Sequence, residues 1–309
     1  MNILITGGAG FIGSHVADAL IAAGHSAVII DDLSTGLKSK VNERATFYRM
    51  DIRDRAVEDI FRRHSIDVVS HHAAQMDVRR SVEDPEFDAS VNIAGSLNIL
   101  ECARRSGVKK IIFASTGGAI YGEQVRFPAD EEHPTNPLSP YGISKLSVEK
   151  YLSFYSNVHH LTTIVLRYAN VYGPRQRPDG EAGVVAIFGE KMFKGGTPTI
   201  NGDGTQTRDF VYVEDVVRAN LLALNYPASE TFNVGTGKEH DVNFIFRELK
   251  RHLSPDCAEH HGPAKAGEQK RSVISPAKIA RMLAWKPSVS MDEGLSRTAE
   301  WLRSGKAGR

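Results

Sequence analysis

Short apolar runs alternate with longer helical patterns through the first half of the chain. Six runs rich in Val, Ile, Leu and Phe predict strands, at residues 2–6, 26–30, 46–50, 66–70, 110–115 and 161–168. Apolar positions at helical spacing predict helices between them, at residues 12–23, 55–63, 85–106 and 141–156. Regular alternation of strand and helix indicates right-handed crossovers and a parallel sheet covered by helices on both faces.

This rhythm breaks after Tyr168. Residues 173–183 are dominated by glycine, proline and charged residues, and a strand–helix–strand pattern returns at residues 209–234. Further helices are predicted at residues 184–193, 244–253, 276–283 and 291–303. We therefore predict an α/β protein in which a doubly wound parallel sheet is joined to a smaller, discontinuous α/β domain. The larger domain would comprise residues 1–167 and 209–235, and the smaller one residues 168–208 and 236–309.

The first predicted strand leads directly into a glycine-rich loop. Residues 6–13 read TGGAGFIG, so Gly7, Gly10 and Gly13 stand between a strand and a helix, as in a Rossmann fold. There Gly7 permits a tight turn, Gly10 lets the backbone approach a pyrophosphate, and Gly13 lets the helix pack closely on the strand. The sequence therefore predicts dinucleotide contacts from Gly7, Gly10, Phe11, Ile12 and Gly13.

Asp31 ends the second predicted strand, where a carboxylate can accept hydrogen bonds from the hydroxyls of an adenine ribose. The same negative charge would repel a 2′-phosphate. Asp31, with Asp32 beside it, therefore favours NAD over NADP, although Lys38 and Lys40 nearby oppose that preference. We predict that the cofactor is NAD.

Tyr141 and Lys145 stand four residues apart in a predicted helix, so their side chains project from one face. A free tyrosine titrates near ~10, which is too high for a base at neutral pH. An ammonium about 6 Å away would stabilise the phenolate by ~2.8 kcal/mol at an effective dielectric of about 20, so we expect Lys145 to lower the pKa of Tyr141. Together with Thr116 and the glycine loop, the pair predicts redox chemistry on a nucleotide-bound alcohol.

Composition excludes several classes of protein. The 309 residues include 38 Lys and Arg against 37 Asp and Glu, and no segment gathers the positive charges for nucleic acid or a membrane surface. No signal peptide and no membrane span are predicted. Cys102 and Cys257 suit a reducing compartment, so we expect a cytoplasmic protein. Histidine pairs at 71/72, 159/160 and 260/261 lack metal-ligand spacing, so we expect no metal site.

With these motifs the chain resembles the extended short-chain dehydrogenase/reductase family, which includes the NAD-dependent epimerases and dehydratases, and most closely its UDP-glucose 4-epimerases. The resemblance covers nearly the whole length. Besides the glycine loop it rests on HAAQ (72–75), ASTGGAIYG (114–122), SPYGISK (139–145), LRYANVYGPRQ (166–176), GDGTQTRDFVYVEDV (202–216) and a closing Leu-Ala-Trp (283–285).

The resemblance implies a mechanism. Tyr141 would take the proton of the sugar 4-hydroxyl while hydride leaves C4 for the nicotinamide, and hydride would return to the other face of the resulting 4-keto sugar. Thr116, with Ser115 as the second choice, would bind the reacting oxygen, and Lys145 would hold the nicotinamide ribose. Further dinucleotide contacts implied by the family are Asp51, Ile52, Ala73, Ala74, Gln75, Asn92 and Tyr168.

The resemblance also implies a UDP-sugar substrate. Besides Thr116 and Tyr141, its contacts would be Asn170, Val184, Val185, Thr199, Ile200, Asn201 and Arg208. Arg208 is the strongest candidate because a guanidinium offers paired donors to phosphate; the alternative is a surface arginine paired with Asp209. Lys265 and Glu268 stand where the family has arginine and aspartate. Ser272 is small where a bulky residue would crowd C2, so we expect N-acetylated UDP-hexosamines to be epimerised as well as UDP-glucose and UDP-galactose.

Other activities share the predicted fold. A dehydratase is one alternative, but the family's dehydratases carry acidic residues directly after the threonine, where this chain has Gly117 and Gly118, and this disfavours dehydration. A uronate epimerase, a decarboxylase, a reductase that exchanges its cofactor and a non-catalytic NAD-sensing protein stay open, although a sensor would not need Thr116, Tyr141 and Lys145. In the family, the helices predicted here at residues 85–106 and 141–156 form dimers, so the resemblance implies a homodimer.

Overall fold

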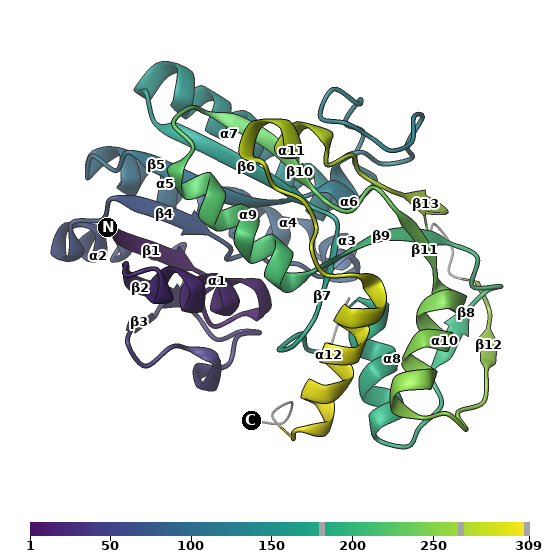
Figure 1. The fold of residues 1–309 in the computed structure, drawn as a ribbon. Helices are drawn as coiled ribbons and strands as arrows, with labels where there is room; N and C mark the ends of the chain where they lie inside the picture. The colour runs from purple at the N-terminus through teal and green to yellow at the C-terminus, as the bar shows by residue number, and fades with distance from the viewer. Residues whose placement is uncertain (179–182, 265–268, 306–309) are drawn as a thin grey trace.

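The computed structural model describes residues 1–178, 183–264 and 269–305. Its centre is a parallel seven-stranded sheet in the order β10-β6-β5-β4-β1-β2-β3 (Figure 1). The strands are β1 (Asn2–Thr6), β2 (Ser26–Asp31), β3 (Thr46–Arg49), β4 (Val68–His71), β5 (Lys110–Thr116), β6 (Thr162–Tyr168) and β10 (Glu230–Val234). All six strands predicted in the first half of the chain are present, and the doubly wound Rossmann arrangement is confirmed.

Helices cover both faces of this sheet. One face carries α1 (Phe11–Ala22) and α9 (Val213–Asn225), and the other carries α2 (Val57–His64), α5 (Ser96–Arg105) and α7 (Pro140–His159). Alternate residues of each strand enter the two cores, so that in β1 Ile3 and Ile5 face one core and Leu4 faces the other. Because both faces are buried, the strands read as continuous apolar runs.

The helix predicted at residues 85–106 is interrupted. α4 (Pro85–Ala89) passes through a π-helical turn at Ser90–Gly95 before α5 begins. A short helix that the sequence analysis missed, α3 (Val78–Glu83), precedes α4, and the Asp84 carboxylate caps α4 by accepting from the Phe87 N–H at 2.9 Å. Turns of the π type often mark functional positions, and this one contains Asn92.

The remaining elements form a smaller group at the right of Figure 1. A four-stranded sheet contains β7 (Asn170–Tyr172), β9 (Thr207–Tyr212), β11 (Glu239–Asp241) and β13 (Arg271–Ser272), and β8 (Thr199–Asn201) pairs with β12 (His260–Gly262). α8 (Val184–Phe193), α10 (Val242–Leu253) and α12 (Met291–Arg303) enclose a third core. Two short helices, α6 (Gly117–Ile120) and α11 (Ala277–Leu283), and a 3₁₀ turn at Lys38–Lys40 complete the described elements.

Two buried carboxylates tie the late segments to the sheets. Asp209, 1% exposed, accepts from the Thr236 hydroxyl at 2.6 Å and the Gly237 N–H at 3.1 Å. Asp215, 0% exposed, accepts from the Ser288 hydroxyl at 2.8 Å and the Val289 N–H at 3.2 Å. Asp209 and Asp215, two of the acidic residues in the motif at 202–216, therefore organise the fold.

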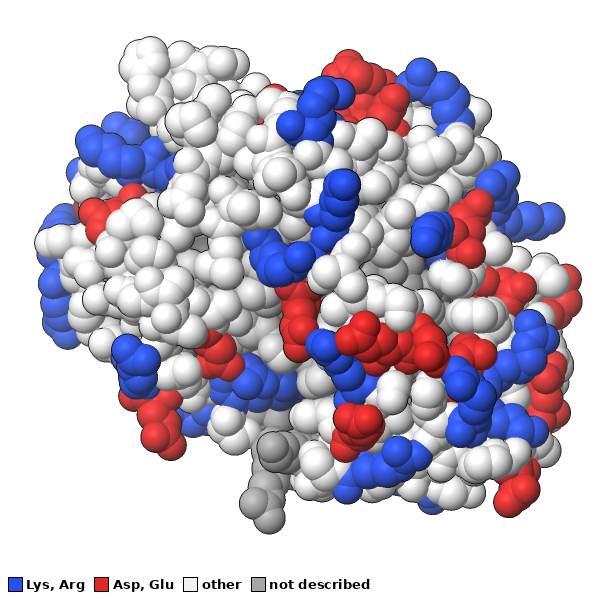
Figure 2. Space-filling model, viewed as in Figure 1, with Lys and Arg blue, Asp and Glu red and all other residues white. Residues whose placement is uncertain are grey.

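The surface carries both signs of charge. Lys and Arg are interspersed with Asp and Glu on the face shown in Figure 2, in keeping with the net charge of +1. Among the helices of the described residues, none has the length and apolar content needed to cross a membrane.

Candidate active site

The winding of the sheet reverses between β1 and β4, and in an open α/β sheet this point carries a crevice at the carboxyl ends of the strands. The glycine loop leaves β1 here. Gly7 has φ +68°, and a Cβ on it would lie 2.6 Å from the Ala73 backbone nitrogen. A Cβ on Gly13 would collide with the Gly7 carbonyl oxygen. The turn and the close packing of α1 therefore both require glycine.

Asp31 lies at the edge of this crevice. It is 7% exposed, and its carboxylate accepts from the Ala9 N–H at 2.9 Å and the Leu33 N–H at 2.8 Å, which fixes its orientation next to the loop. Burial raises its pKa. The Asp32 carboxylate instead accepts from the Ser34 hydroxyl at 2.6 Å in an exposed turn. The structure thus separates the two adjacent acids, and Asp31 is the one placed for a ribose.

The lysines near Asp31 already have partners. Lys40 Nζ donates to the Arg175 carbonyl at 2.9 Å, and burial lowers the pKa of Lys40 to about 8. Lys38 Nζ lies 3.6 Å from the centroid of the Phe47 ring. The Lys40 ammonium still acts on Asp31 through space and opposes the rise in the pKa of that carboxyl.

The segment after β4 is held by Asn92. This residue is 2% exposed; its Nδ2 donates to the Gln75 carbonyl at 2.8 Å, and its Oδ1 accepts from the Gln75 N–H at 2.9 Å. Gln75 Nε2 and Asn92 Nδ2 also donate to Asp88 Oδ1, each at 2.9 Å. Asn92 thus fixes the backbone course of residues 73–75, which carries Ala73 and Ala74 along the crevice.

Three other predicted dinucleotide residues have different surroundings. Asp51 pairs with Arg53 at 2.6 Å, and this partner lowers the pKa of the carboxyl. Ile52 is 4% exposed and belongs to the core beneath α5. Tyr168 is 5% exposed at the end of β6, and its hydroxyl donates to Asn220 Oδ1 at 3.2 Å.

Tyr141 and Lys145 lie in the first two turns of α7. The Ser139 hydroxyl caps this helix by accepting from the Gly142 N–H at 3.2 Å. Lys145 is 4% exposed; its Nζ donates to the Ala114 carbonyl at 2.9 Å and lies 5.9 Å from the centroid of the Tyr141 ring. The phenol and the ammonium therefore meet beside the end of β5, as their four-residue spacing predicts.

The expected lowering of the Tyr141 pKa is not found. Burial, and after it the Asp88 carboxylate, raise the pKa of Tyr141. Burial lowers the pKa of Lys145 to about 8, against the opposing effect of Asp88 and Glu149. A phenolate in a desolvated site loses its favourable interaction with water. The attraction of one ammonium at this distance does not make up for that loss. The prediction of a lowered Tyr141 pKa was wrong because burial and the charge of Asp88 both oppose the effect of Lys145.

Ser115 and Thr116 are distinguished by their partners. The Ser115 hydroxyl donates to Glu149 Oε1 at 2.6 Å in the core. Thr116 Oγ1 accepts from the Ala119 N–H at 3.2 Å and so caps α6; this bond uses an oxygen lone pair and not the hydroxyl hydrogen. A Cβ on Gly142 would lie 2.8 Å from the Ala119 carbonyl, so α6 packs against the start of α7. The geometry favours Thr116 as a donor near Tyr141.

The predicted sugar-nucleotide residues are spread over the smaller group of elements. Arg208 and Ser272 are opposite each other in the β9–β13 pair, and Asn170 Nδ2 donates to the Asp209 carbonyl at 3.3 Å. Val184 and Val185 begin α8, and Thr199, Ile200 and Asn201 form β8. Val185 is 1% exposed and Ile200 is 0% exposed, so their side chains belong to the third core. Lys265 and Glu268 lie outside the described residues.

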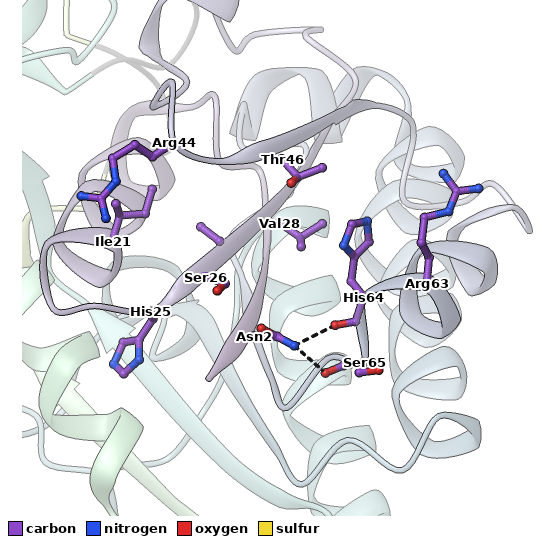
Figure 3. Close-up of a pocket in the computed structure, with 11 residues that line it drawn as sticks. Asn2, Ile21, His25, Ser26, Val28, Arg44, Thr46, Arg63, His64 and Ser65 are labelled. Carbon is purple, nitrogen blue, oxygen red and sulfur yellow. Dashed lines mark hydrogen bonds between the residues drawn. The ribbon is translucent and has the colours of Figure 1, made fainter.

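A groove of about 580 Å³ lies at the opposite end of the large sheet (Figure 3). Its lining comes from the amino-terminal ends of β1, β2 and β3 and from the end of α2, and includes His25, Arg44 and Arg63. Open α/β sheets bind their ligands at the carboxyl ends of the strands. The groove is therefore separate from the site of Tyr141 and Lys145.

Residues 3–235 match the model of the NAD dependent epimerase/dehydratase family. The chain belongs to this family. A UDP-glucose 4-epimerase of Mycolicibacterium smegmatis is 42% identical over 312 residues, covering 98% of this chain and 99% of that protein.

Solved structures in the family have the same fold. A UDP-glucose 4-epimerase of Thermotoga maritima, crystallised with UDP-glucose, superposes with a TM-score of 0.97 at 50% identity and covers 99% of this chain and 100% of its own. A UDP-glucose 4-epimerase of Thermus thermophilus in complex with NAD gives a TM-score of 0.93 at 44% identity, with 98% and 99% covered.

The glycine loop fits the dinucleotide that the family name implies. Gly10 precedes α1 without a side-chain cap in the described structure, and a Cβ on it would meet only the Gly7 carbonyl, at 3.1 Å. The space beside Gly10 is therefore open, and the N–H groups in the first turn of a helix favour an anion at such a place. With the Asp31 carboxylate beside it, the loop suits a pyrophosphate followed by a ribose.

Sequence reasoning missed several buried charged residues behind the site. Glu149 and Arg167 pair at 2.6 Å with side chains 7% and 8% exposed, and Arg167 Nη1 donates to the Tyr121 hydroxyl at 2.9 Å. Asp88 is 0% exposed. The sequence does contain a signal for these buried charges. Glu149 follows Lys145 by four residues and Asp88 precedes Asn92 by four, so each acid lies on the same inward helix face as a predicted site residue.

Proposed function

We propose that this protein is a UDP-hexose 4-epimerase that interconverts UDP-glucose and UDP-galactose. The observation that carries the proposal is the placement of Lys145 Nζ, 2.9 Å from the Ala114 carbonyl and 5.9 Å from the Tyr141 ring, at the strand end that bears Thr116. Family membership and the similarity to UDP-glucose 4-epimerases over the whole chain support it.

Each residue of this group has a role in the proposal. Tyr141 holds the proton removed from the sugar 4-hydroxyl and returns it at the end of the reaction. Thr116 donates a hydrogen bond to the same oxygen, and Lys145 binds the nicotinamide ribose and keeps a positive charge beside the phenol. NAD, when bound, supplies a hydride acceptor that gives the hydride back within one turnover.

The two predicted domains would bind different ligands. In this proposal residues 1–167 and 209–235 bind NAD, through the glycine loop, Asp31, residues 73–75 and Tyr168. Residues 168–208 and 236–309 bind the UDP-sugar, with Arg208 on the diphosphate. Cys102 and Cys257 are free thiols, which supports work in the reducing cytoplasm.

The reaction can be tested with a panel of UDP-hexoses, UDP-hexosamines and UDP-uronic acids, with the configuration at C4 read by NMR. We expect UDP-glucose and UDP-galactose to interconvert without added cofactor, and the purified protein to contain about one NAD per chain by this proposal. A dehydrated product, inversion of uronic acids alone, or net consumption of NADH would point to another activity of the family.

We also propose that N-acetylated UDP-hexosamines are substrates, because Ser272 adds little volume beside Arg208 on the β9–β13 pair. Ser272 is itself 3% exposed. We therefore attribute the space for a substituent at C2 of the sugar to the small size of Ser272, and not to a direct contact of its side chain with the sugar. Ser272→Tyr should reduce turnover of UDP-N-acetylglucosamine more than that of UDP-glucose. Equal losses on both sugars, or no turnover of the acetylated sugar by the wild type, would contradict this extension.

A homodimer through α7 completes the proposal. Ile143, Tyr151, Phe154 and Val158 are 40–54% exposed and lie on one stripe of this helix. Exposed apolar stripes of this kind favour association. Phe154→Asp should convert a dimer to a monomer in analytical ultracentrifugation, whereas Val125→Asp, in a loop outside the stripe, should not. A monomeric wild type would exclude the dimer.

A further inference from the structure

Asp88 is a buried carboxylate between the dinucleotide wall and the helix of Tyr141 and Lys145. Its Oδ1 accepts from Gln75 Nε2 and Asn92 Nδ2, each at 2.9 Å, and its Oδ2 accepts from the Ser144 hydroxyl at 2.7 Å. It is 0% exposed. One side chain on α4 therefore connects the segment after β4 to the first turns of α7.

The three groups that donate to Asp88 are neutral, so its charge must be balanced by a group farther away. One such group is Lys145, whose ammonium is stabilised by the charges of Asp88 and Glu149. Glu149 already pairs with Arg167 at 2.6 Å. A buried charge without a compensating charge is unfavourable, so Asp88 and Lys145 depend on each other.

Two histidines also face Lys145 from the end of β4, but they add no charge. Burial lowers the pKa of both His71 and His72 to about 3, so the rings are neutral at physiological pH. The charges around the phenol of Tyr141 are then the Lys145 ammonium, which favours the phenolate, and the Asp88 carboxylate, which opposes it.

We propose that Asp88 is a positioning residue for the epimerase reaction: it fixes the Gln75–Asn92 wall to α7 and places a carboxylate behind Lys145 and Tyr141. The consequences for turnover rest on the proposed function. The contacts and the charge belong to the protein alone, so they can be tested without substrate.

Asp88→Asn separates the charge from the contacts. The amide oxygen can keep the bonds from Gln75 and Asn92, and the amide NH₂ can face Ser144, whose hydroxyl is able to rotate and accept. The variant should fold and should move both limbs of the pH profile of kcat to lower pH by roughly one unit, because loss of a nearby negative charge favours both the phenolate of Tyr141 and the neutral amine of Lys145.

Three further variants complete this experiment. Asp88→Glu keeps the charge and should restore the position of both limbs. Glu86→Gln removes an exposed charge from the same helix and should leave the profile unchanged. Ser144→Ala breaks the contact to α7 and should lower kcat without moving the limbs. If Asp88→Asn lowers kcat equally at every pH, Asp88 is a structural residue and the proposal is wrong.

Two measurements on the protein without substrate do not depend on turnover. Tyrosinate absorbance, with Tyr141→Phe as the blank, should report a lower titration midpoint for Tyr141 in Asp88→Asn than in the wild type. Hydrogen–deuterium exchange at residues 73–75 should be faster in Ser144→Ala, which loses the bond from Ser144 to Asp88, than in the wild type; unchanged exchange would overturn the proposal even if Asp88→Asn does not fold. Failure of the UDP-hexose assay alone would count against the proposed function and not against these results.

Discussion

The dinucleotide side and the sugar side of the candidate site are assembled in different ways. The first is made at the ends of neighbouring parallel strands: Gly7 follows β1, Asp31 ends β2 and Gln75 follows β4. The second depends on short strands that are distant in sequence, as where Ser272 pairs with Arg208. A repeated strand–helix unit brings strand ends to one edge of the sheet, whereas no local pattern specifies the pairing of β9 with β13.

This difference determines which predicted site residues are good choices for mutagenesis. On the dinucleotide side, a position at a strand end already implies a place in the crevice. On the sugar side, the resemblance supplied positions without orientations, and the side chains of Val185 and Ile200 lie in the core. Variants on the two sides should therefore separate effects on chemistry and NAD from effects on the UDP-sugar.

The largest expected effect is on the chemical step. Tyr141→Phe removes the group that carries the proton, and general acid–base catalysis contributes about 10²–10⁴-fold, so kcat should fall by about 10³-fold or more. NAD should remain bound, as measured by cofactor content after purification. Tyr151→Phe, on the exposed side of the same helix, is the matched control and should keep wild-type kcat. A non-catalytic sensor would be insensitive to both changes.

The next effect is on cofactor affinity alone. Gly7→Ala would place a Cβ 2.6 Å from the Ala73 nitrogen at φ +68°, so the loop must move, and we expect NAD to bind on the order of 100-fold more weakly, or by about 2.7 kcal/mol. Gly24→Ala is the control, because Gly24 has φ +85° but a Cβ there has no neighbour within 4 Å. NAD content after purification, and calorimetric titration of NAD into protein from which the bound NAD has been removed, would distinguish them; equal losses would mean that backbone strain, and not the crevice, is responsible.

How much the sequence could predict follows from the same comparison. Hydrophobic periodicity located the six strands of the first half, because each is buried on both faces and leaves a continuous apolar run. Spacing alone placed Lys145 on the same helix face as Tyr141. The pattern could not reveal the π-helical turn at Ser90–Gly95, since the spacing of apolar residues does not distinguish a single π turn from the α-helix around it. It also could not give the Tyr141 pKa, which depends on burial and on the distant Asp88.

A smaller effect should distinguish the adjacent residues Thr116 and Ser115. Thr116→Ala removes a donor near the reacting oxygen and should lower kcat by about 30-fold, while Thr116→Ser should restore most of it. Ser115→Ala breaks the 2.6 Å bond to Glu149 and should mainly lower the free energy of unfolding, by about 1–3 kcal/mol. Chemical denaturation and steady-state kinetics on both variants would test this; the reverse assignment of effects would make Ser115 the substrate donor.

The smallest effect is expected on the sugar side. Arg208→Lys keeps the charge but loses the planar pair of donors that suits a diphosphate, so KM for UDP-glucose should rise by about tenfold, equivalent to about 1.4 kcal/mol, with kcat little changed. Arg271→Lys is the matched control, because Arg271 precedes Ser272 in the same strand, is exposed and pairs with Glu239 at 2.6 Å. If both variants raise KM equally, the effect comes from a general change in the smaller sheet, and Arg208 makes no specific contact with the diphosphate. If only kcat falls in Arg208→Lys, the residue acts on the chemical step, and the division between the two sides of the site is incomplete.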